Sequence, residues 1–157
     1  MATITVNTTG TQPHLYVSTD TGNVANAPLD VTCLQDITIT NSTGIFSWVD
    51  FCSTDMNKIT TPADNELSTN IVLDDDVWFG TGGSGNATQR GISGLSNNKV
   101  KVSWKLVMNG NSSANGASYY SGTGYLSSVA PTVSPDSPIW VSPLTIAVTG
   151  SMTTGTV

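Results

Sequence analysis

A two-residue alternation within residues 99–108 constrains the fold of this chain more than any other feature. Apolar side chains occupy one parity and lysine or serine the other, namely Val100, Val102, Trp104 and Leu106 against Lys99, Lys101, Ser103 and Lys105. Successive side chains of a β-strand point to opposite faces of its sheet, so this period predicts a strand with one face in the core. An amphipathic helix is excluded here, because the apolar side chains of such a helix recur about every 3.6 residues.

The same period indicates further strands along the chain. Alternating stretches occur at residues 3–6, 14–17, 37–40 and 144–149. Residues 119–129 predict a longer strand, in which Gly122 and Gly124 indicate a bulge or a close backbone approach. One short helix is expected over residues 88–95, with Asn86 as its N-cap and with Ile92 and Leu95 on one face.

The composition favours a single β-rich domain over residues 1–157. Only 10% of the residues are charged, against about 25% in average domains. Glu66 is the only glutamate, and the other acids are aspartates, which favour caps and turns over helix interiors. Helix bundles and coiled coils are therefore excluded. The formal charge of −6 disfavours a nucleic-acid-binding protein, because such proteins neutralise phosphates with basic side chains.

The chain shows no sign of a membrane or export segment. Its apolar stretches are shorter than a membrane-spanning helix requires. The first ten residues lack the basic and apolar parts of a signal peptide, so we expect the chain to act or assemble in a cytoplasm. In that setting Cys33 and Cys52 are expected to be buried, reduced thiols rather than a disulfide.

Residues suited to catalysis or metal binding are scarce. His14 is the only histidine, no Gly-x-Ser-x-Gly motif accompanies it, and a pair of glutamates for glycoside hydrolysis is absent. The acidic run at residues 74–76 matches no calcium-loop spacing, so we interpret it as a solvated turn. We predict neither an enzyme nor a bound metal or cofactor.

Two irregular stretches are candidates for contacts with partners. Residues 46–65 are predicted to be a strand edge that runs into a long loop, with Phe46, Trp48 and Phe51 close together. Residues 121–144 contain four prolines, which confine this stretch to a turn and a sheet edge.

Three of the five basic residues, Lys99, Lys101 and Lys105, share one face of the strand predicted at 99–108. The set is too small for a nucleic-acid site and has no aromatic side chain on the same strand face. At a sheet edge or a subunit contact, these lysines would deter unwanted strand pairing or would pair with acids of another subunit. The alternative interpretation is an ordinary solvated strand face.

Six segments follow one another in an order that is found in a known family. They are LYVSTDTG, PLDVTCLQDITITNS, NELSTNIVLDDDVWFG, TQRGISGLSNN, KVKVSWKLV and the closing hairpin YYSGTGYLSSVAPTVSPDSPIWVSPLTIAVTGSMTTG. Together they resemble the major tail tube proteins of tailed bacteriophages, of the lambda type, and the similarly built tube protein of type six secretion systems. The resemblance covers most of the chain.

This resemblance implies a mainly β fold, a two-sheet β-sandwich or half-barrel with one short flanking α-helix and long loops. It implies a structural virion protein of the tail, assembled in the host cytoplasm. Six copies would form a ring, and rings would stack into a hollow tube that conducts DNA during ejection without binding it specifically. The implied partners are further copies of the chain and the tape measure, terminator and initiator proteins of the tail.

Candidate site residues follow from that plan. Acidic side chains facing the lumen would repel DNA, and Asp36, at the start of an alternating strand, is our candidate. The lysine face is the candidate inter-subunit strand face. The candidate ring-stacking loop contains Phe46, Trp48, Phe51, Asp55 and Lys58.

Two other function classes fit the same composition. A capsid decoration protein would also be small, acidic, β-rich and free of catalytic residues, but it would form trimers or dimers. A carbohydrate-binding β-sandwich module would need an aromatic platform. Its candidates are the four tryptophans, Trp48, Trp78, Trp104 and Trp140, of which Trp104 is expected in the core.

Overall fold

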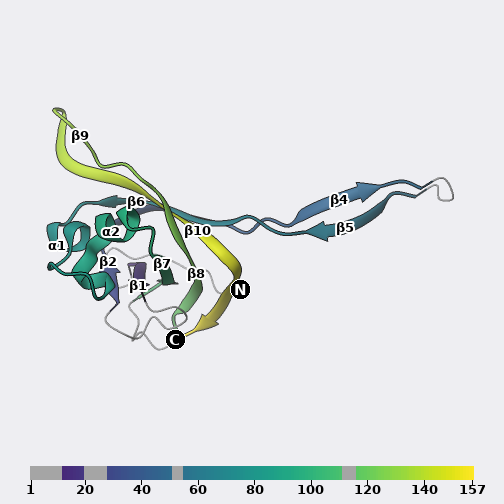
Figure 1. Cartoon of the computed structure of the whole chain (residues 1–157), viewed down its shortest axis with the longest axis horizontal. Coiled ribbons are helices and arrows are strands. Elements are labelled where there is room, and N and C mark those ends of the chain that lie inside the picture. Colours follow the sequence, from purple (N-terminus) through teal and green to yellow (C-terminus); the bar gives the residue numbers. More distant parts are fainter. Residues whose placement is uncertain (1–11, 20–27, 51–54, 111–115) are drawn as a thin grey trace.

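The computed structural model of the chain describes residues 12–19, 28–50, 55–110 and 116–157 (Figure 1). Within these residues most of the chain is β-strand. The strands are β1 His14–Ser18, β2 Leu29–Val31, β3 Leu34–Thr40, β4 Gly44–Trp48, β5 Asn57–Thr61, β6 Asn65–Val72, β7 Lys101–Val107, β8 Ser118–Val129, β9 Thr132–Ser134 and β10 Ser137–Thr156. The helices are α1 Asp75–Phe79 and α2 Ala87–Asn97. No helix in the described ranges is long and apolar enough to cross a membrane.

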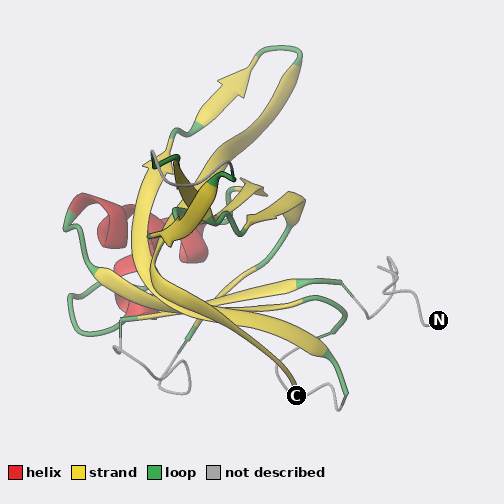
Figure 2. Ribbon diagram, turned by 90° about the vertical axis from the view of Figure 1, so that its right-hand side faces the viewer, coloured by secondary structure: helices red, strands yellow, loops and turns green. Residues whose placement is uncertain are grey.

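Eight strands form one antiparallel sheet that curls strongly. Its order is β2-β1-β7-β8-β10-β6-β3, with β9 paired to β10. The strands at the two ends of this order, β2 and β3, are joined by Thr32 and Cys33 alone, a link that spans about 11 Å at most. In a flat sheet the same two strands would lie about 29 Å apart. The sheet therefore bends into a half-barrel, whose curvature Figure 2 shows.

The predicted fold class is confirmed: the chain is mainly β, with a curled half-barrel sheet, a second small sheet and a short helix against the large one. The alternation at 99–108 is a sheet strand, β7, in which Val102 and Trp104 are fully buried while Lys101 and Lys105 are half-buried. Lys99 lies in the turn before this strand, with a φ of 51°. At the end of the chain, β10 repeats the pattern with Leu144 and Ile146 in the core.

Helix α2 covers the apolar face of the sheet where the sequence predicts a helix. The Oδ1 atom of Asn86 accepts a hydrogen bond from the Gln89 N–H at 2.9 Å and so caps the first turn. Ile92 and Leu95 are fully buried in the core. The helix is kinked at Gly91, whose φ is 63°.

The acidic run at 74–76 is exposed to solvent, as predicted, but it begins a helix and is not a simple turn. The carboxylate of Asp74 accepts hydrogen bonds from the backbone N–H groups of Asp76, at 3.1 Å, and Val77, at 3.3 Å. A carboxylate stabilises a helix start because the first N–H groups of a helix have no partner within it. Trp78, one turn further, is buried in the core.

Residues 46–65, predicted to be mainly a long loop, instead contain most of a β-hairpin. Strands β4 and β5 pair with each other over five residues, from Gly44 opposite Thr61 to Trp48 opposite Asn57. They form a two-stranded sheet separate from the large one. Figure 1 shows this hairpin extending far from the body. Sequence alternation is weak here because the side chains of both faces are exposed.

Both glycines of β8 lie in close contact with neighbouring residues, as predicted. A side chain on Gly122 would meet the Trp104 ring at 3.2 Å, and one on Gly124 would overlap the carbonyl oxygen of Ala147. Cys33 differs from expectation, because it is exposed and free. It occupies the corner between β2 and β3 with a φ of 58°, which turns its side chain outward. Cys52 lies outside the described residues.

Candidate assembly surfaces

The hairpin of β4 and β5, residues 44–61, which we call the arm, exposes an unusual amount of apolar surface. Its exposed apolar side chains are Ile45, Phe46, Trp48, Val49, Met56 and Ile59, each between 41% and 60% exposed. An isolated two-stranded hairpin is marginally stable in water, and exposed apolar clusters mark interaction sites. The arm therefore has the properties of a segment that is covered by a partner.

The strand register divides the arm into two different faces. Phe46 lies opposite Ile59, and its ring stacks on that of Trp48 with centroids 6.0 Å apart. Directly opposite residues share a face, so these three side chains form one apolar patch. Lys58 lies opposite Ser47 and so belongs to the other face.

Not all predicted stacking residues are brought together. Phe46 and Trp48 are neighbours, Lys58 is on the opposite face, and Asp55 precedes β5. Phe51 lies outside the described residues.

A second exposed apolar segment, which the sequence did not reveal, is the hairpin of β9 and the start of β10. We call residues 132–141 the finger. Its exposed apolar side chains are Val133, Ile139, Trp140 and Val141. In Figure 1 the finger and the arm extend from opposite ends of the molecule. The prolines around it predicted only a turn and a sheet edge, because no alternation marks a hairpin that is exposed on every side.

The two exposed tryptophans do not form one aromatic platform. Trp48 is on the arm and Trp140 is on the finger, at opposite ends of the chain's long axis. Trp78 and Trp104 are buried in the core. This distribution disfavours the carbohydrate-binding alternative, which requires aromatic rings presented together.

The strand that carries Lys101 and Lys105 is an interior strand of the sheet, so the expectation of an edge strand is wrong. Strand β7 pairs with β1 on one side and with β8 on the other. Lys101 lies opposite Tyr125, and the ammonium group of Lys105 sits 4.2 Å from the centroid of the Tyr119 ring. Aromatic side chains from adjacent strands thus accompany the lysines, which the sequence of one strand could not show. Such a cation–π contact is worth about 0.5–1 kcal/mol at exposed sites.

Asp36 occupies an irregular position on the edge strand β3. Its φ is 48°, and the pairing of β3 with β6 shifts register between Gln35 and Thr38. Aspartate adopts this left-handed conformation more readily than most residues. The bulge interrupts the expected alternation, so that Leu34 and Ile37 are both half-buried while Asp36 is exposed. Its side chain is thus accessible to solvent in the single subunit.

Other charged groups have structural roles. The Nδ1 atom of His14 lies 3.1 Å from a carboxylate oxygen of Asp30, and its ring stacks on Tyr16. Across the described ranges no group of three or more His, Cys, Asp or Glu side chains is arranged to hold a metal ion. Most described acids lie outside the large sheet, on the arm and its base, in the first turn of α1 and at the turn of the finger.

No known protein family and no curated protein matches the sequence. Solved structures match its fold over nearly the whole chain. A chain from the virion of a native gene transfer agent has a TM-score of 0.61 at 11% identity, covering 90% of this chain and 95% of that one. A chain from the tail of an empty gene transfer agent particle, computed with C6 symmetry, has a TM-score of 0.59 at 11% identity, with coverages of 88% and 93%.

A third match comes from an extracellular contractile injection system, in its PVC sheath/tube terminator in the extended state. It has a TM-score of 0.53 at 10% identity and covers 92% of this chain and 93% of that one. At these identities the similarity establishes the fold. This chain has the fold of chains found in virion, tail and injection-system particles, in agreement with the expected tail tube-like fold.

Proposed function

We propose that this chain is a structural protein of a virion tail, in which six copies form a ring and rings stack into a hollow tube that conducts DNA. The observation that supports this most is the fold match over 88% of the chain to a chain in a tail computed with C6 symmetry.

The shape of the subunit supports ring formation. Strands β2 and β3 end the order of the large sheet, so each has one side without a described strand partner. Unpaired strand edges are templates for pairing with another chain. Joining β2 of one copy to β3 of the next is a heterologous contact, which closes into a ring when the rotation per subunit is suitable. Asp36, exposed on β3, would then lie at the subunit boundary and is our candidate lumen acid.

The arm supports stacking. Its apolar patch at Phe46, Trp48 and Ile59 is exposed in the single subunit, and its length lets it reach beyond the body (Figure 1). A neighbouring ring that covered this patch would bury apolar area at about 25 cal/mol per Å². The half-buried Lys101 and Lys105, together with exposed Lys99, are the candidate inter-subunit cations for acids on another copy.

The partners in this proposal are further copies of the chain and the tape measure, terminator and initiator proteins of the tail. Assembly takes place in the host cytoplasm, and DNA passes through the lumen without specific binding. No catalytic step and no cofactor are part of the proposed role.

Negative-stain electron microscopy of the purified full chain, from dilute to concentrated, tests the proposal. We expect six-fold rings or hollow tubes. Trimers or dimers would contradict it and favour a capsid decoration protein, and binding on a glycan array would favour a carbohydrate module.

Two variants sharpen that test. A chain in which the arm residues 46–59 are replaced by a short glycine-serine turn should remain a folded monomer that does not polymerise. A truncated chain that still forms tubes would refute the assignment of the arm. Asp36→Asn in assembled particles should leave tube length unchanged and slow DNA ejection, whereas unchanged ejection kinetics would remove Asp36 from the lumen.

A further inference from the structure

Exposed apolar side chains are concentrated on two segments of the described chain, the arm and the finger. Of the twelve large apolar side chains that are exposed among the described residues, six are on the arm and four are on the finger, and the other two are Phe79 and Tyr125. The two segments extend from opposite ends of the molecule (Figure 1). Exposed apolar clusters mark interaction sites, so each end of the subunit carries a surface for a partner.

A tube made of identical rings brings these two ends together. Each ring has the same orientation as the one before it, so one end of a subunit meets the opposite end of a subunit in the next ring. Such a head-to-tail contact is heterologous and can be repeated indefinitely, as a tube of many rings requires. Because the arm is assigned to one neighbouring ring, the end that carries the finger faces the ring on the other side.

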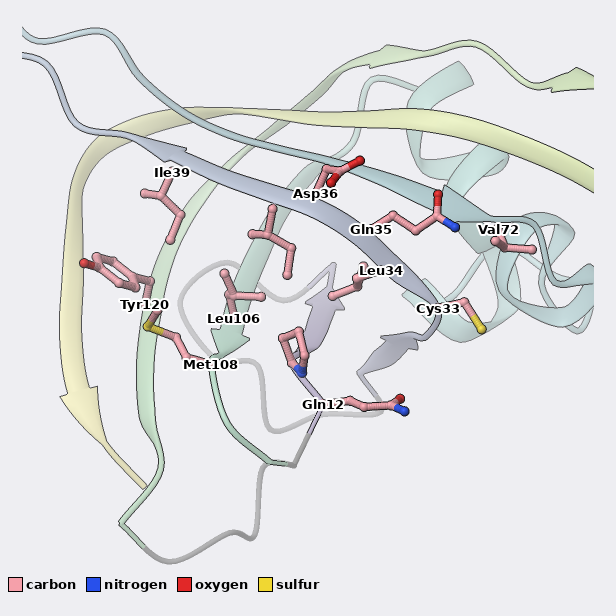
Figure 3. Close-up of a pocket in the computed structure, with 12 residues that line it drawn as sticks. Gln12, Cys33, Leu34, Gln35, Asp36, Ile39, Val72, Leu106, Met108 and Tyr120 are labelled. Carbon is pink, nitrogen blue, oxygen red and sulfur yellow. The ribbon is translucent and has the colours of Figure 1, made fainter. Parts of the chain in front are cut away.

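The third apolar surface is a cavity of about 840 Å³ in the body. Leu34 and Ile39 of β3 point into it, and it is also lined by residues of β7 and β8, among them Leu106 and Tyr120 (Figure 3). The free edge of β3 is assigned to the neighbouring subunit of the same ring, so the cavity lies beside the contact within a ring. We therefore assign it no part in the contact between rings.

The charges of the arm and the finger are complementary at one pair of residues. Asp136, in the turn of the finger, is the only charged residue among residues 132–141, and Lys58 of β5 is the only basic residue of the arm. Both side chains are exposed, and among the described residues neither has an ionic partner. The remaining basic residues of the chain belong to α2, to β7 and to the turn before β7.

The position of Lys58 on the arm determines where the finger fits. Asp50 follows β4 and Asp55 precedes β5, so both acids lie toward the far end of the arm, where they would repel Asp136. Lys58 and Ile59 are consecutive residues of β5, which pairs with β4 on one side and with no described strand on the other. A finger that lies along this free edge reaches the apolar patch of the arm on one face, through Ile59, and Lys58 on the other.

We propose that the finger of a copy in the next ring lies along the free edge of β5, with its apolar side chains against the apolar patch of the arm and Asp136 beside Lys58. This contact rests on the proposed function, because it supplies the partner of the arm in ring stacking. It leaves the edges of β2 and β3 available for pairing within a ring. The apolar side chains lose exposed area in the contact, and the ion pair fixes its register, since charge complementarity gives specificity more than affinity.

Exchange of the two charges tests the contact in the full-length chain. We expect Lys58→Glu and Asp136→Lys each to raise the concentration at which rings stack into tubes by about tenfold or more, because each replaces attraction with repulsion at every subunit between two rings. The double variant Lys58→Glu with Asp136→Lys restores opposite charges and should stack within about threefold of the wild-type concentration. Sedimentation and negative-stain electron microscopy measure stacking, and circular dichroism verifies that each variant is folded.

The matched control is Lys58→Glu with Asp64→Lys, which has the same net charge as the restoring double variant. Asp64 is exposed and lies between β5 and β6, at the base of the arm, so this exchange should not restore stacking. If the wild type forms tubes but the single variants stack at the same concentration, or the two double variants behave alike, the contact is overturned and the tube is not. A wild-type chain that forms neither rings nor tubes would refute the proposed function, and this contact with it.

Discussion

The large sheet and the arm are both antiparallel β-structure, yet they place their apolar residues in opposite ways. In β7, Val102 and Trp104 are fully buried, whereas in β4 Phe46 is 58% exposed. The sheet completes its packing within the subunit. The arm does not, because among the described strands β4 and β5 pair only with each other. Strands with a clear polar–apolar contrast therefore stabilise this subunit, and strands without it are available to partners.

The largest effect that this comparison predicts is the loss of a core side chain. Trp104→Ala should lower the free energy of unfolding by about 3–5 kcal/mol, because it removes a fully buried ring and leaves a cavity. Urea unfolding of the monomer followed by circular dichroism measures it. A loss below about 1 kcal/mol would mean that Trp104 is not packed in the core as described.

A smaller loss is expected where the two helices meet. Gly91 has a φ of 63°, and a side chain on it would overlap the backbone of Trp78 and Gly80. Gly91→Ala should therefore cost about 3 kcal/mol of stability, from strain and overlap together. Gly82→Ala is the matched control, because Gly82 also has a positive φ but nothing lies within 4 Å of the added atom. It should cost about 1 kcal/mol, and equal losses would refute the close contact.

The cap of α2 gives a still smaller effect. Asn86→Ala removes the side-chain acceptor for the Gln89 N–H and should cost about 1 kcal/mol in the same unfolding experiment. Asn86→Asp keeps an acceptor and should retain most of the stability. If Asn86→Asp were as damaging as Asn86→Ala, the cap would not be the cause.

The contrast between sheet and arm also explains which elements could be predicted from the sequence. β7, β10 and α2 were predictable because burial on one side imposes a period on each of them, and Asn86 marks where α2 begins. The curl of the sheet could not be predicted. It depends on a two-residue connection, Thr32 and Cys33, between β2 and β3, and the sequence does not show that these strands end the strand order on opposite sides.

The candidate surfaces were predictable only in part. Phe46 and Trp48 could be singled out because aromatic residues cluster there in an irregular stretch. Their strand register could not be predicted, because neither face of the hairpin is buried and so no alternation marks it. The finger at Ile139 and Trp140 was missed for the same reason. The sequence of one strand shows which residues share a face but not which strands lie beside it, so it could not show that the strand of Lys101 and Lys105 is an interior one. For the same reason it could not show that Tyr119 and Tyr125 of β8 lie beside these lysines.

The smallest effect on stability tests the comparison most sharply. Phe46 and Ile45 are adjacent in β4, 58% and 60% exposed, and lie on opposite faces of the arm. Phe46→Ser and Ile45→Ser should each change the free energy of unfolding of the monomer by no more than about 0.5 kcal/mol, because neither side chain is part of the core. In assembly, however, they should differ. Phe46→Ser breaks the patch shared with Trp48 and Ile59, so it should raise the concentration needed for rings or tubes in sedimentation and electron microscopy.

Ile45→Ser leaves that patch intact and should assemble close to the wild-type concentration. If both variants fail to assemble, partners cover the two faces of the arm alike. If both assemble normally, the arm is not the contact surface, and the exposed finger becomes the first place to look. A large loss of monomer stability from Phe46→Ser would contradict the comparison itself, since it would mean that the arm packs within its own subunit as the sheet does.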